Sequence, residues 1–271
     1  MTRSEPEAEP TTWHYGLIAK WWAEFNTSGP EIEYFRPFVE AGQPALDVAC
    51  GTGRLLIPYL QVGLDVDGVD ISDDMLALCR ERAERHGLRP QLYRQAMHQL
   101  DLPRKYRTIY VCGGFGIGGG RRADDETALR RLREHLEPGG LLILDNEVPY
   151  SDGHNWSYWT SDKRRELPQP WSEPGERRRG SDGSEYALSG RLLEVDPLAQ
   201  RVVAQIRGHR WRDGELVEQD EHTLKMNVYF TNELRALLES AGFSVRLRTD
   251  YTDTEPTADS RFVVFLAQRP A

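Results

Sequence analysis

The sequence predicts an α/β protein with a mostly parallel, doubly wound sheet, into which a small antiparallel sheet is inserted. A short apolar run over residues 45–48 breaks at Gly51 and Gly53 and continues into an apolar, helix-like segment. A second apolar run ends at Asp70. Between residues 186 and 229 the hydrophobic period changes to two, as antiparallel strands require. A strand, a glycine turn and a helix in this order are typical of parallel α/β units.

The glycine turn and Asp70 together predict a site for an adenosine group. Asp70 follows Gly51 by 19 residues, about the length of one crossover helix plus the next strand. A carboxylate so placed can accept both hydroxyls of a ribose, while glycine lets the backbone approach the ligand closely. Leu56 stands where a dinucleotide-binding turn has its third glycine, which argues against a pyrophosphate ligand.

The other core elements follow from periodicity and turn residues. Residues 1–12 are rich in glutamate and proline and predict a disordered tail. A helix is expected over residues 13–26, with His14 on its surface, and Ser72 is expected to cap a later helix. Further helices are expected over residues 32–39, 54–61, 124–135 and 231–242. Further strands are expected over residues 92–95, 108–112, 141–144, 245–249 and 262–267.

An insertion separates the expected strand at residues 141–144 from the expected helix at residues 231–242. Residues 150–184 are rich in Trp, Pro, Gly, Ser and charge, and are too long for a plain connection in a compact domain. Asp196-Pro197 and Asp213-Gly214 then punctuate about three alternating strands as turns. We therefore expect residues 13–149 and 230–271 to form the core, and residues 150–229 to form the inserted subdomain.

Composition excludes several classes of protein. The 271 residues are 39% hydrophobic and 28% charged, and the net charge of −9 argues against a broad nucleic-acid-binding face. Cys50, Cys79 and Cys112 have neither metal nor disulfide spacing, so no metal site is expected. The sequence shows no signal peptide and no apolar run long enough to span a membrane, so the expected location is cytoplasmic.

Residues 46–53, with the sequence LDVACGTG, resemble motif I of the class I S-adenosylmethionine (SAM)-dependent methyltransferases. The run Leu136-Glu137-Pro138-Gly139-Gly140, followed by an apolar strand, is similar to the same family. The resemblance covers residues 13–149 and 230–269 and implies a Rossmann-like, seven-stranded sheet. It also implies SAM as the cofactor.

The resemblance assigns roles to residues of this chain. It places Asp47, Gly51 and Gly53 at the methionine end of SAM, with Ala49 and Thr52 in the same turn, and Asp70 at the ribose. It places Ile71, Met75, Ala96 and Met97 around the adenine, and Cys112 and Gly113 beside the sulfonium. Tyr15 and Trp21 are expected on a lid near the sulfonium, where an aromatic face attracts a cation. Ala96 replaces an acid that the family commonly places against the adenine amino group.

The inserted antiparallel sheet resembles the small-molecule branch of the family, including the sugar N-methyltransferases. There it forms a wall of the acceptor site or a dimer contact, so we expect a small-molecule acceptor, no nucleic acid or membrane partner, and a monomer or homodimer. Methyl transfer to nitrogen or oxygen proceeds by in-line displacement, and only a hydroxyl acceptor usually needs a base. Candidates for that base are His154, which is the first to test, and Tyr150.

Two alternatives stay open at this point. One is an NAD-dependent oxidoreductase on a similar sheet, against which Leu56 and the Leu-Glu-Pro-Gly-Gly run count. The other is a non-catalytic SAM-binding protein, which the sequence hardly distinguishes from an enzyme because alkylation does not require a catalytic side chain.

Overall fold

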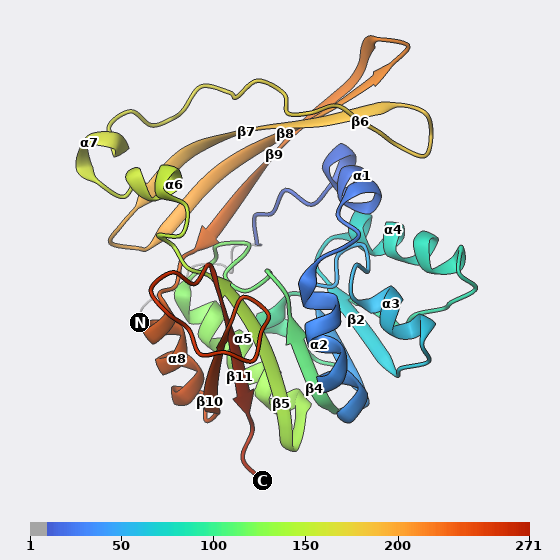
Figure 1. Cartoon of the computed structure of the whole chain (residues 1–271), viewed down its shortest axis with the longest axis vertical. Coiled ribbons are helices and arrows are strands. Elements are labelled where there is room, and N and C mark those ends of the chain that lie inside the picture. Colours follow the sequence, from blue (N-terminus) through green and yellow to red (C-terminus); the bar gives the residue numbers. More distant parts are fainter. Residues whose placement is uncertain (1–9) are drawn as a thin grey trace, which may run out of the picture.

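The computed structural model describes residues 10–271 and contains two sheets. The larger sheet has seven strands in the order β10-β11-β5-β4-β1-β2-β3, and the smaller has four in the order β6-β7-β8-β9 (Figure 1). Within the larger sheet β11 alone is antiparallel to the other six strands. The predicted fold class, a mostly parallel seven-stranded sheet with an inserted antiparallel sheet, is therefore confirmed.

The strands of the larger sheet occupy the apolar runs of the sequence. Their bounds are β1 Ala45–Val48, β2 Val66–Asp70, β3 Leu92–Arg94, β4 Tyr106–Val111, β5 Leu136–Glu147, β10 Ser244–Thr249 and β11 Phe262–Gln268. Strand β5 begins five residues earlier than the expected strand at 141, because Leu136 already pairs with Tyr106 of β4. The Glu-Pro-Gly-Gly run forms an irregularity between this pair and the next. Strand order reverses between β1 and β4, and a crevice opens above the carboxyl ends of strands at such a point.

Helices cover both faces of the larger sheet. Their bounds are α1 Gly16–Phe25, α2 Pro30–Ala41, α3 Leu56–Gln61, α4 Asp73–Glu84, η1 Met97–Gln99, α5 Arg122–His135 and α8 Thr231–Ser240. Successive residues of β4 enter opposite cores: Ile109 packs with α5 and α8, whereas Tyr110 packs with α2 and α3. Two separate apolar cores, one on each face, are the physical basis of the doubly wound arrangement.

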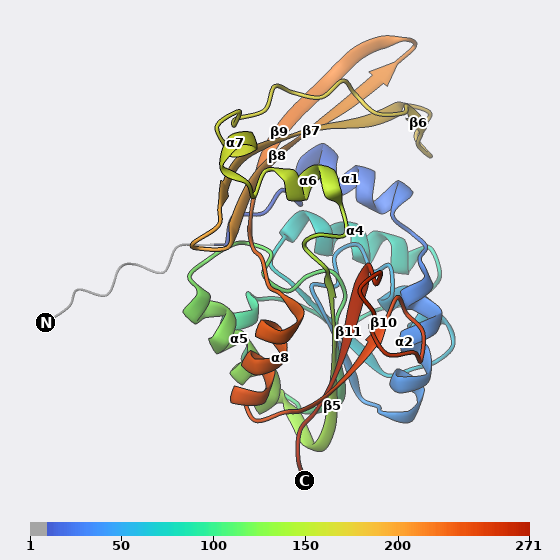
Figure 2. The ribbon, with the colours of Figure 1, turned by 60° about the vertical axis from the view of Figure 1, so that its left-hand side comes forward.

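The inserted sheet crosses above the core, and α1 lies between the two (Figures 1 and 2). Its strands are β6 Arg178–Arg179, β7 Glu185–Asp196, β8 Arg201–Arg212 and β9 Glu215–Asn227. Both predicted turns are present, and Asp213 and Gly214 have φ angles of 53° and 85°, as a tight hairpin turn requires. The segment before the sheet contains two short helices, α6 Gly153–Ser157 and α7 Ser161–Arg164.

Contacts between distant residues fix the inserted sheet on the core. Asp220 of β9 accepts a hydrogen bond at 2.7 Å from the backbone nitrogen of Leu17, at the start of α1. Arg122 of α5 donates to Glu233 at 2.7 Å and to the carbonyl oxygen of Val228 at 2.9 Å. The second sheet is therefore held against α1, α5 and α8.

The N-terminal segment also belongs to this arrangement. The predicted disordered tail lies outside the described residues as far as residue 9, but Thr11 forms a β-bridge with Gly118 and accepts a hydrogen bond from the backbone of Lys225. Within residues 10–271 no helix is both long and apolar enough to cross a membrane.

Candidate active site

The turn after β1 is held in an unusual backbone conformation. Ala49, Gly51 and Gly53 all have positive φ angles, of 59°, 53° and 82°. Arg82 of α4 donates from Nη1 to the carbonyl oxygen of Thr52 at 2.6 Å and to its Oγ1 at 3.0 Å. The turn therefore takes its shape from left-handed backbone positions and from a guanidinium that is remote in sequence.

Asp70, the last residue of β2, is bonded to this turn. Its Oδ2 accepts a hydrogen bond from the backbone nitrogen of Gly51 at 2.9 Å, and its Oδ1 accepts one from that of Ser72 at 2.8 Å. Burial raises the pKa of the Asp70 carboxyl, and the N–H groups of Ser72 and Gly51 act in the opposite direction. Each oxygen keeps a further lone pair with which it can accept a hydroxyl.

A chain of buried polar groups lies beside the ends of β4 and β5. Arg54 forms an ion pair with Glu31 and donates to Sγ of Cys112 at 3.5 Å. Asp145 accepts from that thiol at 3.3 Å and from the backbone nitrogen of Gly113 at 2.5 Å. Burial raises the pKa of both the Cys112 thiol and the Asp145 carboxyl. These contacts fix the backbone at Gly113.

A cavity of about 390 Å³ lies over these strand ends, a size at which proteins bind cofactors and small molecules. Asp47, which is buried and whose pKa is raised by that burial, forms part of its floor. Gly51 and Gly113 both line the cavity with positive φ, and a Cβ on either would meet no atom within 4 Å. These two glycines therefore leave open space for a ligand, as a nucleoside-binding cradle requires.

The N-terminal segment forms the opposite wall. The residues that line the cavity from this side are Pro10, Thr12, Trp13, His14, Trp22 and Asn26. Ser72 donates from Oγ to the carbonyl oxygen of His14 at 2.5 Å, and Asp74 accepts from the backbone nitrogen of Gly16 at 2.8 Å. The wall is therefore bonded to the start of α4, directly after the predicted ribose ligand.

Most residues named from the sequence border this cavity. Those that line it are Asp47, Ala49, Gly51, Thr52, Asp70, Ile71, Met75, Ala96, Met97, Cys112 and Gly113. Gly53 does not line it. A Cβ at Gly53 would lie 2.7 Å from Sγ of Cys79, so this glycine serves the packing of the turn on α4.

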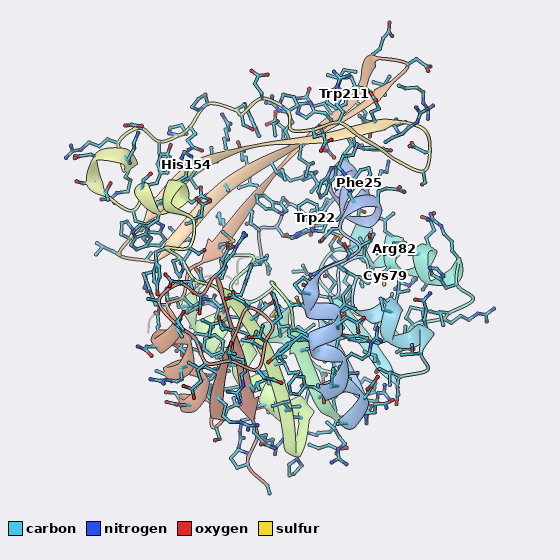
Figure 3. All side chains as sticks on the ribbon, viewed as in Figure 1. Trp22, Phe25, Cys79, Arg82, His154 and Trp211 are labelled. Atoms are coloured by element: carbon cyan, nitrogen blue, oxygen red, sulfur yellow. The ribbon has the colours of Figure 1, made fainter. Side chains whose placement is uncertain are left out.

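The predicted lid residues lie outside the cavity lining. The ring of Tyr15 is 5.9 Å from the ring of His222, and the ring of Trp21 packs on Phe25 at 5.5 Å. Neighbouring residues on a helix point in different directions, and of the two adjacent tryptophans of α1 it is Trp22, not Trp21, that lines the cavity. Figure 3 shows Trp22 between the core and the inserted sheet.

Both candidate bases also lie away from the cavity. His154 is exposed on α6, and Figure 3 shows it well separated from Trp22. Tyr150 is 48% exposed, and its ring packs on Trp156 at 6.3 Å. Neither residue is among those that line the cavity.

Sequence reasoning missed the residues of the opposite wall. His14 was expected on a helix surface, but it precedes α1 and lines the cavity. No local pattern distinguishes it from a surface histidine, since its position depends on Ser72. Arg54 directly follows the glycine turn, so its place in the motif is a signal that was available.

This fold and cavity define a class of protein. A parallel sheet whose first strand leads into a glycine turn, and whose second ends in a buried acid bonded to that turn, is a Rossmann-like nucleoside-binding fold. The lack of a third glycine at Leu56 separates it from dinucleotide-binding proteins.

Comparison with known proteins identifies the family. Residues 45–140 match the family model of the methyltransferase domain. YqeM of Bacillus subtilis (strain 168), which has a provisional methyltransferase name, is 23% identical over 263 residues, covering 94% of this chain and 97% of YqeM. A SAM-dependent methyltransferase structure from Clostridium acetobutylicum ATCC 824 superposes with a TM-score of 0.71 at 17% identity, covering 94% of this chain and 98% of that one. The CcbJ methyltransferase structure from Streptomyces caelestis gives 0.68 at 22% identity, covering 95% and 100%.

The chain is a class I SAM-dependent methyltransferase. Its cofactor is SAM, and the comparisons do not favour the oxidoreductase alternative.

Proposed function

We propose that this methyltransferase transfers the methyl group of SAM to the nitrogen of a small polar amine, with amino sugars as the acceptor class. The observation that carries the proposal is a cavity with walls on two sides. The N-terminal wall and two residues of β9, Leu224 and Met226, line it opposite the strand ends, so the reacting atom of the acceptor must reach the methyl group of SAM inside a cavity of about 390 Å³ that SAM itself partly fills. A small molecule fits such a space, whereas a protein surface or a nucleic acid duplex does not.

The relatives support nitrogen as the acceptor atom. The dTDP-3-amino-3,4,6-trideoxy-alpha-D-glucopyranose N,N-dimethyltransferase of Streptomyces venezuelae is 33% identical over 102 residues, covering 37% of this chain and 40% of that enzyme. The structure of the sugar N-methyltransferase KedS8 from Streptoalloteichus sp. ATCC 53650 superposes with a TM-score of 0.65 at 19% identity, covering 100% of this chain and 98% of that one. The demethylmenaquinone methyltransferase of Symbiobacterium thermophilum is 36% identical over 142 residues and covers 50% of this chain, so a quinol acceptor is the second class that the transfer assay includes.

The cavity residues take the following roles in this proposal. Asp70 holds the ribose hydroxyls, Asp47 and the Gly51 turn hold the methionine end, and Ile71 and Met97 border the adenine. When bound, SAM would supply an electrophilic methyl group: the amine nitrogen would form the new C–N bond as the C–S bond breaks, sulfur would keep the electron pair, and the resulting ammonium would release its proton to water. The protein then has mainly to align a free amine with that methyl group, and such alignment contributes roughly 7–11 kcal/mol. This division of labour requires no side-chain base, in agreement with the positions of His154 and Tyr150 outside the cavity.

Transfer of labelled methyl groups by the purified chain tests the proposal. The acceptors are dTDP-3-amino-3,4,6-trideoxy-glucose, the matching sugar with a hydroxyl in place of the amine, and a demethylated naphthoquinol. We expect label in the amine alone. Label only in the hydroxyl sugar or the quinol would contradict the nitrogen assignment, and SAM binding with no transfer to any of the three would contradict amino sugars as the acceptor class. The cytoplasmic location and the monomeric or homodimeric state stay predictions, which cell fractionation and light scattering would check.

A further inference from the structure

The wall opposite the strand ends carries an imidazole that the cofactor-binding assignment does not use. In folds of this kind the carboxyl ends of the strands hold the nucleotide portion of the ligand. The opposite wall, made by Thr12, Trp13, His14 and Trp22, therefore faces the space that remains for the acceptor. A hydrogen-bonding side chain on this wall is placed to meet the acceptor directly.

The His14 ring is held from several directions. Its Nδ1 lies 2.5 Å from Oγ1 of Thr12, a buried hydroxyl. The ring packs edge-on against Trp22 at 5.5 Å and Trp13 at 6.4 Å, and Ser72 fixes the carbonyl oxygen of the same residue. Within the described part of the chain Nε2 has no hydrogen-bond partner. Nε2 is therefore the one ring nitrogen available to a ligand.

We propose that Nε2 of His14 accepts a hydrogen bond from an N–H of the acceptor amine and so directs the nitrogen lone pair toward the methyl group of SAM. In this arrangement Nδ1–H donates to Thr12 Oγ1, which leaves the lone pair of Nε2 free. His14 is then a catalytic residue by contact with the acceptor, and Thr12 is a positioning residue. The inference rests on the proposed function.

The surroundings of the ring support an acceptor role. Burial lowers the pKa of His14 to about 4, so the ring is neutral at physiological pH and can accept a hydrogen bond, which an imidazolium cannot. A neutral ring also avoids repulsion with the positive sulfonium. The rings of Trp13 and Trp22 add aromatic surface to the same wall, which favours a cationic or amine-bearing ligand.

Kinetics of matched variants form the first test. With the amino sugar named above, His14→Phe should lower kcat/KM by about tenfold or more, the loss expected for one hydrogen bond to the reacting group. His14→Gln, whose amide oxygen can accept an N–H, should retain more activity than His14→Phe. Thr12→Val should lower kcat/KM and Thr12→Ser should restore it, because only the serine keeps the hydroxyl. His154→Phe, on exposed α6, is the control and should behave as the wild type.

The second test does not depend on turnover. S-adenosylhomocysteine should bind His14→Phe and wild type with the same Kd by calorimetry. In the wild type with S-adenosylhomocysteine bound, addition of the amino sugar should move the ¹⁵N resonance of His14 Nε2, and the matching hydroxyl sugar should move it less. The inference is wrong if His14→Phe keeps wild-type kcat/KM, if it weakens cofactor binding by the same factor as kcat/KM, or if the Nε2 resonance does not respond to a methylated amine. If the resonance responds but no amine is methylated, the contact stands and the proposed function fails.

Discussion

The carboxylate of Asp70 lies 2.9 Å from the backbone nitrogen of Gly51 and so joins the ends of the first two strands. The same side chain accepts from Ser72, whose hydroxyl in turn bonds the carbonyl oxygen of His14. One acid therefore connects the glycine turn, the start of α4 and the N-terminal wall of the cavity. A ligand that engages Asp70 contacts the point at which the two walls meet.

Asp70→Ala is expected to weaken SAM binding by about 10- to 150-fold, because hydrogen bonds to a charged group contribute roughly 1.5–3 kcal/mol. The thermal shift produced by SAM should therefore be smaller than that of the wild type at the same SAM concentration. The control is Asp73→Ala, a neighbouring acid whose side chain is 69% exposed and pairs with Arg94. An unchanged SAM response in Asp70→Ala would mean that the ribose ligand lies elsewhere.

Arg82→Met is expected to weaken S-adenosylhomocysteine binding by about 5- to 30-fold. The substitution removes two hydrogen bonds to Thr52, each worth about 1 kcal/mol, and leaves the turn without these hydrogen bonds from α4. Figure 3 shows Arg82 on this helix beside Cys79. Calorimetry measures the effect, and Arg85→Met, which breaks only a surface ion pair with Glu81, is the matched control. Equal affinities of the two variants would show that the turn holds its shape without Arg82.

Gly53→Ala is expected to lower the free energy of unfolding by about 2–4 kcal/mol. A left-handed φ costs a non-glycine residue about 1–2 kcal/mol, and a single added methyl group costs a further ~1–2 kcal/mol, the lower part of the range for overpacking. Both apply here, since φ is +82° and a Cβ would lie 2.7 Å from Sγ of Cys79.

Gly63→Ala separates these two costs in urea unfolding. Gly63 has the same φ of +82°, but a Cβ there meets nothing within 4 Å, so only the backbone cost applies. Added to Cys79→Ala, the substitution Gly53→Ala should cost less free energy of unfolding than it costs in the wild type, because Ile57 at 3.0 Å is then the remaining close contact. Equal destabilisation by the two single alanine substitutions would show that the contact with Cys79 costs nothing.

The free energy of unfolding should fall as pH decreases from about 6.5 toward 4, partly because of His14. Burial lowers the pKa of this imidazole to about 4 in the folded chain, whereas an unfolded histidine titrates near 6.5. Between these values the unfolded chain binds a proton that the folded chain does not, so stability is lost as pH falls. The contribution is roughly 3 kcal/mol, from about 1.4 kcal/mol for each pH unit.

Denaturant titrations of wild type and His14→Gln across this pH range measure that contribution. The unfolding free energy of the wild type minus that of His14→Gln should decrease as pH falls from 6.5 to 4 and stay constant above pH 7. His154→Gln, on exposed α6, should follow the wild type at every pH. A constant difference between wild type and His14→Gln from pH 7 to pH 4 would show that His14 is not buried as a neutral group.

The sequence by itself determined the sheet, the glycine turn and the acid that follows it. These features are local: periodicity fixes strand and helix, and glycine at Gly51 supplies the left-handed φ that the turn needs. The spacing from Gly51 to Asp70 is one βα unit long, so the two residues meet as soon as adjacent parallel strands pair.

Only the tertiary structure decided which residues close the cavity. His14 reaches it through Ser72, 58 residues away, and α1 is fixed by a hydrogen bond between Leu17 and Asp220, 203 residues apart. Helical periodicity identifies an apolar stripe, but it does not tell Trp21 from Trp22 until the helix has a partner on each side. These partners are α4 and the inserted sheet, and burial of α1 between them supplies the energy that orients it, which no local pattern encodes.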